Sequence, residues 1–386
     1  MNALPEDGTL VGRVWNGEGP LIVVRRGDDL IDVTDTFPTM SRLINDADPL
    51  RVYEVDGPVA GEVREILRNS EAGAQPRVPG AAPRLHHPHL LAPNDLLATK
   101  ACGVTFIRSL LERVVEEKAK GDPAVAQQVR GMITEALGDD LSKVAPGSPE
   151  TQALKKKFIA AGVWSQYLEV GIGPDPEVFT KAQPMASVGY GAEVGVLPDS
   201  SWNNPEPEVV LTVSRRGEIR GATLGNDVNL RDYEGRSALL LGEAKDQNGS
   251  CAIGPMIRLF DESFTLADVE ACEVELHITG VDGFETRGRN RMAEISRKPA
   301  DLVAAALGPH HQYPDGMMLF LGTMFAPTDD RDGTGGGFTH KLGDRVEIST
   351  PSLGTLVNTV NHTDKIPPWT FGAGELFDFL QQRRKG

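Results

Sequence analysis

The sequence has few of the features that mark secreted, membrane-spanning or redox-active proteins. Its 386 residues include three cysteines, Cys102, Cys251 and Cys272, which are scattered without the C-x-x-C spacing of a metal or redox site. No stretch approaches the roughly 18 consecutive apolar residues of a membrane span, and the N-terminus lacks the basic and apolar segments of a signal peptide. These absences predict a soluble, cytoplasmic protein with reduced thiols.

Basic residues are also fewer than acidic residues. The chain carries 39 Lys and Arg residues against 55 Asp and Glu residues, which gives a net charge of -16. Nucleic acids and anionic membranes select clusters of Lys and Arg, so we expect neither as a partner. The sequence also lacks a G-x-S-x-G nucleophile turn, a Walker phosphate loop and a zinc signature. A small anionic substrate stays possible, because local charge can still attract it.

The patterning of the chain predicts two parts. Residues 1–90 are expected to form a small β-rich domain that includes an extended run at residues 51–55 and ends in a Pro-rich connector. Residues 91–386 are expected to form the larger domain. Apolar residues at helical spacing predict a helical insertion at about 109–168. Short strands punctuated by glycine after Pro174 predict a mainly antiparallel sheet, interrupted by one helix near residues 297–308.

Two glutamates, Glu206 and Glu208, stand at the entrance to the apolar run Val209–Val213. Alternate residues of a strand share a face, so both acids point the same way and need a shared proton or a shared cation. A lone E-x-E is more often a solvated strand entrance. However, a predicted hairpin would return Asp227 beside the pair, and three carboxylates suit a hard cation such as Mg²⁺ or Mn²⁺.

Several segments together resemble the fumarylacetoacetate hydrolase family. They follow the order of the family over roughly residues 90–386 and read "GVTFIRSLLE" (103–112), "PEVFTK" (176–181), "GNDVNLRD" (225–232), "AKDQNGSCAIGP" (244–255) and "LGT" (321–323). The resemblance implies an α+β fold with a mixed, rolled β-sandwich core. It also implies assembly as a homodimer or homotetramer.

The resemblance assigns roles to six residues. It implies that Glu206, Glu208 and Asp227 are the metal ligands, that Lys245 is the active-site lysine, and that the Thr323 hydroxyl contacts substrate. Lys181 matches a lysine near the site, where a substrate-binding and a structural role are both open.

The sequence departs from the family at Ser109. Hydrolases and decarboxylases of the family carry a histidine there, three residues before a glutamate that is kept here as Glu112. Serine cannot act as an imidazole base near neutral pH, which disfavours hydrolysis of a C–C bond. The remaining acid–base candidates are one carboxyl, Glu112, and one lysine, Lys245. Ser109 is expected to hydrogen-bond a substrate hydroxyl.

Within the family, "DSSWNNPEPEVV" (199–210) is similar to the 2-keto-3-deoxy-pentonate dehydratases. This likeness implies a Mg²⁺-dependent conversion of 2-keto-3-deoxy-D-xylonate to 2,5-dioxopentanoate in pentose catabolism, by elimination of the C4 hydroxyl through a metal-bound enolate. Lys245 would be either the C3 base or an electrostatic brace. The alternative is an acylpyruvate or fumarylpyruvate hydrolase on the same scaffold. A non-catalytic sugar-acid-binding relative is a third possibility, favoured only if Glu112 or Lys245 were missing. Whether His311 or Tyr313 reaches the distal end of the substrate or belongs to a structural loop stays open.

Overall fold

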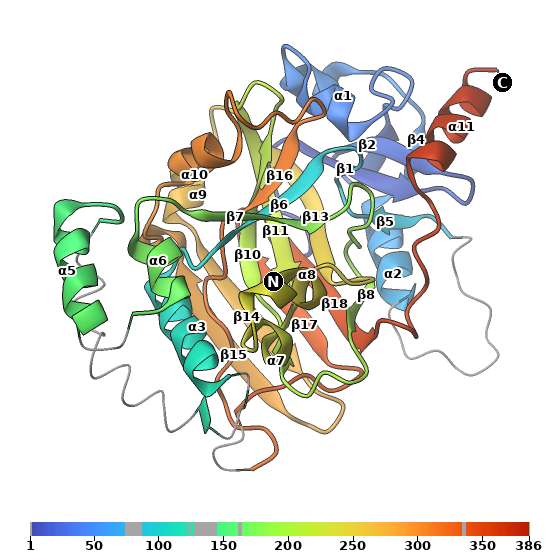
Figure 1. Cartoon of the computed structure of the whole chain (residues 1–386). Helices are drawn as coiled ribbons and strands as arrows, with labels where there is room; N and C mark the ends of the chain where they lie inside the picture. Colours follow the sequence, from blue (N-terminus) through green and yellow to red (C-terminus); the bar gives the residue numbers. More distant parts are fainter. Residues whose placement is uncertain are drawn as a thin grey trace.

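A large twisted sheet runs through the molecule (Figure 1). The computed structural model describes residues 2–73, 87–120, 122, 125–126, 145–160, 164–333 and 337–385. Within these residues the strand order is β4-β3-β2-β1-β13-β11-β10-β16-β6-β7, and β5 also pairs with β1. The strands are β1 (Leu10–Trp15), β2 (Pro20–Arg26), β3 (Asp29–Asp32), β4 (Val59–Glu62), β5 (His89–Leu91), β6 (Ala98–Gly103), β7 (Glu177–Ala182), β10 (Pro207–Val213), β11 (Ile219–Asp227), β13 (Cys251–Leu259) and β16 (Met317–Phe320).

A second sheet packs against one face of the first. Its order is β15 (Glu285–Arg291), β14 (Glu273–Thr279), β17 (Arg345–Thr350), β18 (Gly354–His362) and β8 (Glu193–Val196), while β9 (Asn203–Asn204) and β12 (Asn229–Leu230) form a separate pair. Side chains of both sheets, such as Leu211 and Ile348, share one apolar core. Most pairs are antiparallel, but β16–β6 and β18–β8 are parallel. The predicted α+β fold with mixed, packed sheets is confirmed.

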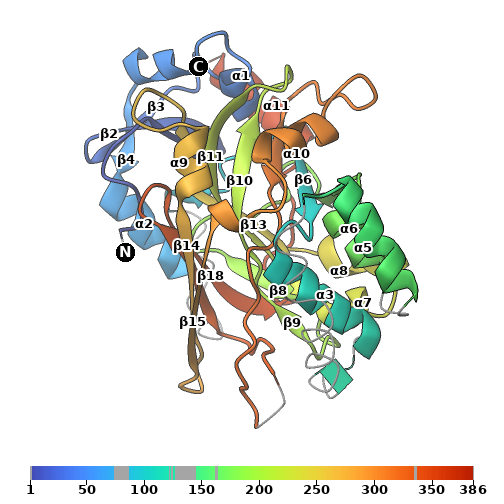
Figure 2. The same cartoon turned by 90° about the vertical axis from the view of Figure 1, so that its left-hand side faces the viewer.

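The helices lie around the sheets, and three of them gather on one side (Figures 1 and 2). These are α3 (Ile107–Ala119), α5 (Pro149–Ala160) and α6 (Gln166–Ile172), which share an apolar cluster with Trp202. The others are α1 (Met40–Ile44), α2 (Val63–Gly73), α7 (Arg231–Glu234), α8 (Leu241–Lys245), α9 (Leu266–Ala271), α10 (Pro299–Ala306) and α11 (Ala373–Arg383), with 3-10 helices η1 (Pro49–Glu54), η2 (Ala238–Leu240) and η3 (Met292–Glu294). None of the described helices is both long enough and apolar enough to cross a lipid bilayer.

The predicted helices of the insertion fall on α3, α5 and α6, and the helix predicted near 297–308 is α10. Residues 127–144 and 161–163, which belong to the same predicted insertion, lie outside the described residues. The insertion therefore places helix α3, which carries Ser109 and Glu112, beside Trp202 and the start of β10.

The N-terminal strands extend the large sheet. Strand β1 pairs with β13, where Leu10 lies opposite Arg258, and also with β5, where Arg13 lies opposite Leu91. A sheet that runs across residue 90 does not by itself locate a domain boundary. The boundary near that residue stays a prediction.

One local prediction is wrong. Residues 51–55 read as an extended run, but Arg51–Glu54 belong to the 3-10 helix η1. The Asp48 side chain accepts a hydrogen bond from the Leu50 N–H at 3.2 Å, and Pro49 occupies the first turn. Both features stabilise a helical start, and they outweigh the apolar alternation of this short segment.

Candidate metal centre

Three carboxylates meet where the hairpin of β10 and β11 ends. Glu208 lies opposite Gly225 in the antiparallel register, and the Asp227 N–H donates to the Glu206 carbonyl at 3.0 Å. The two strands therefore bring Asp227 back beside the two glutamates, as the sequence predicts. One oxygen from each of Glu206, Glu208 and Asp227 lies within 4.8 Å of the others, and all three side chains are buried. This set is called the carboxylate triad below.

The two glutamates of the triad differ in their ionisation. Burial would raise the pKa of Glu206, but the positive charges of Arg113 and Lys245 outweigh it and lower the pKa to about 2. Burial raises the pKa of Glu208 well above its usual range, and the charges of Asp227 and Glu206 add to this effect. Without a cation, the triad therefore keeps Glu206 ionised and favours a proton on Glu208.

Two buried lysines contact the triad. The Lys245 Nζ donates to Glu206 Oε2 at 2.6 Å and to Asp227 Oδ2 at 3.1 Å. Burial alone would lower the pKa of Lys245, but the charges of Asp227 and Glu206 raise it, so Lys245 is an ammonium here. The Lys181 Nζ lies 2.8 Å from Asp227 Oδ1 and also donates to the carbonyls of Val228 and Lys245. These contacts support the triad, and the substrate contact of Lys181 stays a prediction.

The segment that follows β16 completes one side of the triad. The Gly322 N–H donates to Glu208 Oε2 at 2.7 Å, and the Thr323 hydroxyl lies 2.8 Å from Glu206 Oε2 and 3.3 Å from Glu208 Oε1. Gly322 has a φ of +102°, and a Cβ there would fall 2.1 Å from Thr105 Oγ1. Only glycine fits this turn, which aims both donors at the glutamates.

The triad fits a hard divalent cation. Carboxylate oxygens are the ligands that Mg²⁺ prefers, and three of them leave positions for water or substrate. The buried Asp227 Oδ1 accepts no hydrogen bond among the described residues, although Lys181 lies beside it as an ion-pair partner. Four buried cations face five buried carboxylates in this cluster, which consists of Arg113, Lys181, Arg231 and Lys245 with Glu116, Glu206, Glu208, Asp227 and Glu234. When Glu208 is also ionised, a bound cation would offset the excess of negative charge.

Helix α3 reaches the triad through a residue that the sequence did not single out. The Arg113 guanidinium donates to Glu206, to Glu116 at 2.9 Å and to Glu234 at 2.8 Å. The Arg231 Nε lies 3.0 Å from Glu116. Both helices carry an Arg and a Glu three positions apart, which places each pair on one helix face. That spacing is the signal from which this network could have been found.

The other predicted residues lie on the same helix or at the opposite end of β16. Ser109 is buried and Glu112 half-buried on α3, and their proposed contacts with substrate stay predictions. His311 is exposed in the turn that precedes β16, next to Tyr313. Since Thr323 follows the other end of β16, the structure places His311 and Tyr313 away from the triad.

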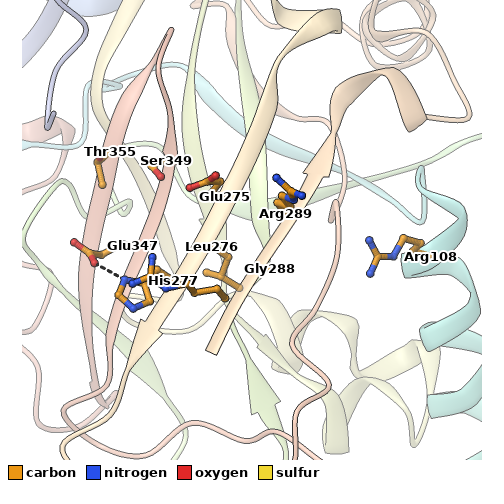
Figure 3. A pocket seen from close by; sticks show the side chains of 10 residues that line it. Arg108, Glu275, Leu276, His277, Gly288, Arg289, Glu347, Ser349 and Thr355 are labelled. Atoms are coloured by element: carbon orange, nitrogen blue, oxygen red, sulfur yellow. Dashed lines mark hydrogen bonds and ion pairs between the residues drawn. The ribbon is translucent and has the colours of Figure 1, made fainter. Parts of the chain in front are cut away.

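A separate hollow of about 670 Å³ lies on the second sheet (Figure 3). Its wall includes Arg108 of α3 and charged side chains of β14, β15 and β17. His277 lies 3.1 Å from Glu347 and 2.9 Å from Glu285, so these carboxylates already have partners. The residues that line the hollow include none of the predicted site residues. The hollow is therefore a separate place from the triad, where buried carboxylates are concentrated.

A known family model matches the part of the chain that carries this site. Residues 172–361 match the family model described as fumarylacetoacetate (FAA) hydrolase C-terminal, and this range contains the whole triad, Lys181, Lys245 and Thr323. Over these residues the chain is similar to the fumarylacetoacetate hydrolase family. The resemblance inferred from the sequence is confirmed.

Two curated relatives of this chain carry dehydratase names. The chain is 32% identical over 191 residues to the 2-dehydro-3-deoxy-D-arabinonate dehydratase of Saccharolobus solfataricus. It is 35% identical over 201 residues to the probable 2-keto-3-deoxyxylonate dehydratase of Haloferax volcanii. Each match covers 50% of this chain, and 60% and 63% of the two relatives respectively.

A solved structure shares the fold. It is a 2-keto-3-deoxy-D-arabinonate dehydratase complexed with magnesium and 2,5-dioxopentanoate, with 21% sequence identity and a TM-score of 0.58. The superposition covers 92% of this chain and 99% of that one. At this identity the likeness establishes the fold alone.

Proposed function

We propose that this chain is a Mg²⁺-dependent dehydratase that converts 2-keto-3-deoxy-D-xylonate to 2,5-dioxopentanoate in oxidative pentose catabolism. The observation that carries the proposal is the buried triad with Lys245 beside it. Support comes from the two relatives named as dehydratases of this substrate class and from the likeness in fold to a magnesium complex. The reaction is a loss of water from C3 and C4.

The triad would hold Mg²⁺ through oxygens of Glu206, Glu208 and Asp227. When bound, the ion would act as a Lewis acid on the 2-oxo acid end of the substrate, which makes the C3 protons more acidic. Lys245 is held as an ammonium between Glu206 and Asp227. In the proposal it therefore braces negative charge that develops at the C2 oxygen, and it does not serve as the C3 base.

Helix α3 would supply the acid for the leaving group. In this proposal the Glu112 carboxylate takes a C3 proton and passes it to the C4 hydroxyl, which departs as water, and Ser109 hydrogen-bonds a neighbouring hydroxyl. Thr323 and Lys181, which contact the triad, would bind the carboxyl end of the substrate. The unsaturated product then tautomerises to the 5-aldehyde.

The rival activity is acylpyruvate or fumarylpyruvate hydrolysis, which needs a base that activates water. Ser109 occupies the position where the family's hydrolases carry histidine, so the dehydratase is favoured. Formation of 2,5-dioxopentanoate is measured with an NAD(P)-linked semialdehyde dehydrogenase, with Mg²⁺, with Mn²⁺ and with a chelator. We expect Mg²⁺-dependent product and no acylpyruvate cleavage. Cleavage of an acylpyruvate without dehydration would reverse the ranking.

Assembly and location are part of the same proposal. We propose a cytoplasmic homodimer or homotetramer that acts on a small 2-oxo sugar acid. Size-exclusion chromatography with light scattering measures the mass in solution, and a monomer at micromolar concentration would contradict the proposed assembly.

A further inference from the structure

We propose that Glu177 of β7 is a second acid–base carboxyl of the site, which moves a proton between C5 and C3 of the substrate after the C4 hydroxyl has left. The inference rests on the proposed dehydratase function and adds the residue that would complete it. Glu112 and Lys245 do not supply this step, because they act on the leaving hydroxyl and at the metal end respectively.

Strand β7 presents Glu177 toward the triad. Glu177 and Phe179 are alternate residues of the strand and share a face, and the Phe179 ring lies 6.0 Å from the Lys245 Nζ. Lys181, further along β7, contacts Asp227 at 2.8 Å. Alternate residues are about 7 Å apart along a strand. Glu177 therefore lies one such step from Phe179, in the direction away from Lys181 and the metal end.

The neighbouring strand leaves room for the Glu177 carboxyl. Gly103 at the end of β6 lies opposite Glu177, and a Cβ on Gly103 would fall 1.8 Å from Glu177 Oε2. Gly103 also begins the segment that leads into α3, the helix that carries Glu112. The carboxyl is thus placed between the end of β6 and the start of α3, on the side where the distal carbons of a substrate held at the triad would extend.

The titratable and charged groups that interact with Glu177 come from six elements. They are Cys102 of β6, Arg113 of α3, Tyr167 of α6, Asp227 of β11, Glu234 of α7 and Lys245 of α8. No hydrogen bond to the carboxyl occurs among the described residues. Burial, followed by the charge of Glu234, raises the pKa of Glu177 to about 7. Both ionisation states are then populated near neutral pH, as a group that accepts and returns a proton requires.

The chemistry needs such a group. Loss of water from C3 and C4 leaves a C3=C4 double bond between the C2 ketone and the C5 alcohol. A carboxylate removes a C5 proton, the C5–H electron pair forms a C4=C5 double bond, and the C3=C4 pair takes a proton at C3 from the same carboxyl. The resulting enol moves its hydroxyl proton to C4 and becomes the aldehyde. The step is an isomerisation and consumes no oxidant.

The test separates loss of substrate from formation of aldehyde. Substrate is followed by chromatography, the unsaturated 2-oxo acid by its near-ultraviolet absorbance, and 2,5-dioxopentanoate by the coupled dehydrogenase. We expect Glu177→Gln to consume substrate within about threefold of the wild-type rate and to form aldehyde about 100-fold more slowly, which is the usual cost of a lost acid–base group. The unsaturated acid should accumulate. The pH profile of aldehyde formation by the wild type should change slope near pH 7. The profile of the variant should show no such change.

Three further variants test whether the Glu177 carboxyl itself is responsible for slow aldehyde formation. Gly103→Ala displaces the carboxyl without removing it and should slow aldehyde formation in the same way. Glu177→Asp keeps the acid and should restore part of the rate. Asp175→Asn removes the same charge from an exposed position two residues away and should behave as wild type. Retained binding of Mg²⁺ and pyruvate shows that each variant is folded.

The outcomes distinguish the two proposals. A wild-type protein that consumes no substrate overturns the dehydratase function, and the role of Glu177 with it. A wild-type dehydratase whose Glu177→Gln variant makes aldehyde at an unchanged rate overturns the role of Glu177 alone. Equal slowing of substrate loss and aldehyde formation, without the unsaturated acid, also overturns it.

Discussion

Arg113 of α3 is bound to Glu206, the first carboxylate of the triad. The same guanidinium contacts Glu116 on its own helix and Glu234 on α7, so one cation joins three buried acids. A buried charge is costly unless it is paired. The position of α3, and with it Glu112, is therefore coupled to the charge state of the triad.

We expect Arg113→Met to destabilise the protein by about 3–5 kcal/mol, because three buried carboxylates lose their shared cation. Mg²⁺ should recover part of this loss, since it would neutralise Glu206 in place of the guanidinium. Urea unfolding with and without Mg²⁺ measures both effects. Arg108→Met is the matched control, because Arg108 is exposed on the same helix. Equal stability of the Arg113 and Arg108 variants would contradict the coupling.

Replacement of the predicted acid gives a second test. We expect Glu112→Gln to lose turnover by about 100-fold or more, while Mg²⁺ and pyruvate still bind. The amide keeps the size of the side chain but cannot donate a proton to the leaving hydroxyl as a carboxylic acid does. Steady-state kinetics and calorimetric titration check the two parts. Dehydration at the wild-type rate would show that the assignment is wrong.

Thr323 allows the hydroxyl contact to be tested without a change of shape. Its hydroxyl lies within hydrogen-bond distance of both glutamates. We expect Thr323→Val to weaken Mg²⁺ binding by about 10–100-fold, as removal of a partner that orients a metal ligand does. Thr323→Ser should bind Mg²⁺ nearly as the wild type does. Unchanged affinity in the valine variant would mean that the hydroxyl does not orient the triad.

His340 gives a prediction about pH. Its ring is buried, its Nδ1 lies 3.1 Å from Asp344, and burial lowers its pKa although Asp344 opposes the shift. The unfolded chain, with an ordinary histidine pKa of about 6.5, then binds more protons than the folded chain as pH falls below that value. Stability from this group is present above pH 6.5 and lost below it, by up to about 1.4 kcal/mol per pH unit.

The measurement compares urea unfolding at pH 7.5 and pH 5.5 for the wild type and His340→Gln. Glutamine does not titrate, so the variant should lose less stability between the two pH values. An identical pH dependence in the two proteins would rule out a buried neutral His340 as the source.

The parts of the site that follow from local pattern could be predicted from the sequence. Alternation placed Glu206 and Glu208 on one face, and a short turn between two apolar runs returned Asp227 beside them. The contact of Arg113 with Glu206 could not be predicted in this way. It joins residues 93 positions apart and depends on how α3 packs against Trp202.

The fold also contains elements that follow from local pattern and elements that depend on tertiary packing. Strand β15 reads "ETRGRNR" and carries exposed charges at alternate positions, so it lacks the apolar alternation by which β14 is recognised. It becomes a strand because β14 supplies a complete antiparallel register, from Glu273 opposite Arg291 to Thr279 opposite Glu285. Pairing of that kind is a tertiary effect, which local propensity does not report.

The pairing of β1 with β13 constrains how the protein is made. Leu10 leaves the ribosome about 250 residues before Arg258, its partner in the sheet. At 5–20 residues per second the two are separated by roughly 12 to 50 seconds of translation. The other end of β1 can pair with β5 much earlier, since Trp15 lies opposite His89. During synthesis, part of one edge of β1 can thus be closed within the first quarter of the chain, while the rest waits for β13, which follows the hairpin that carries the triad.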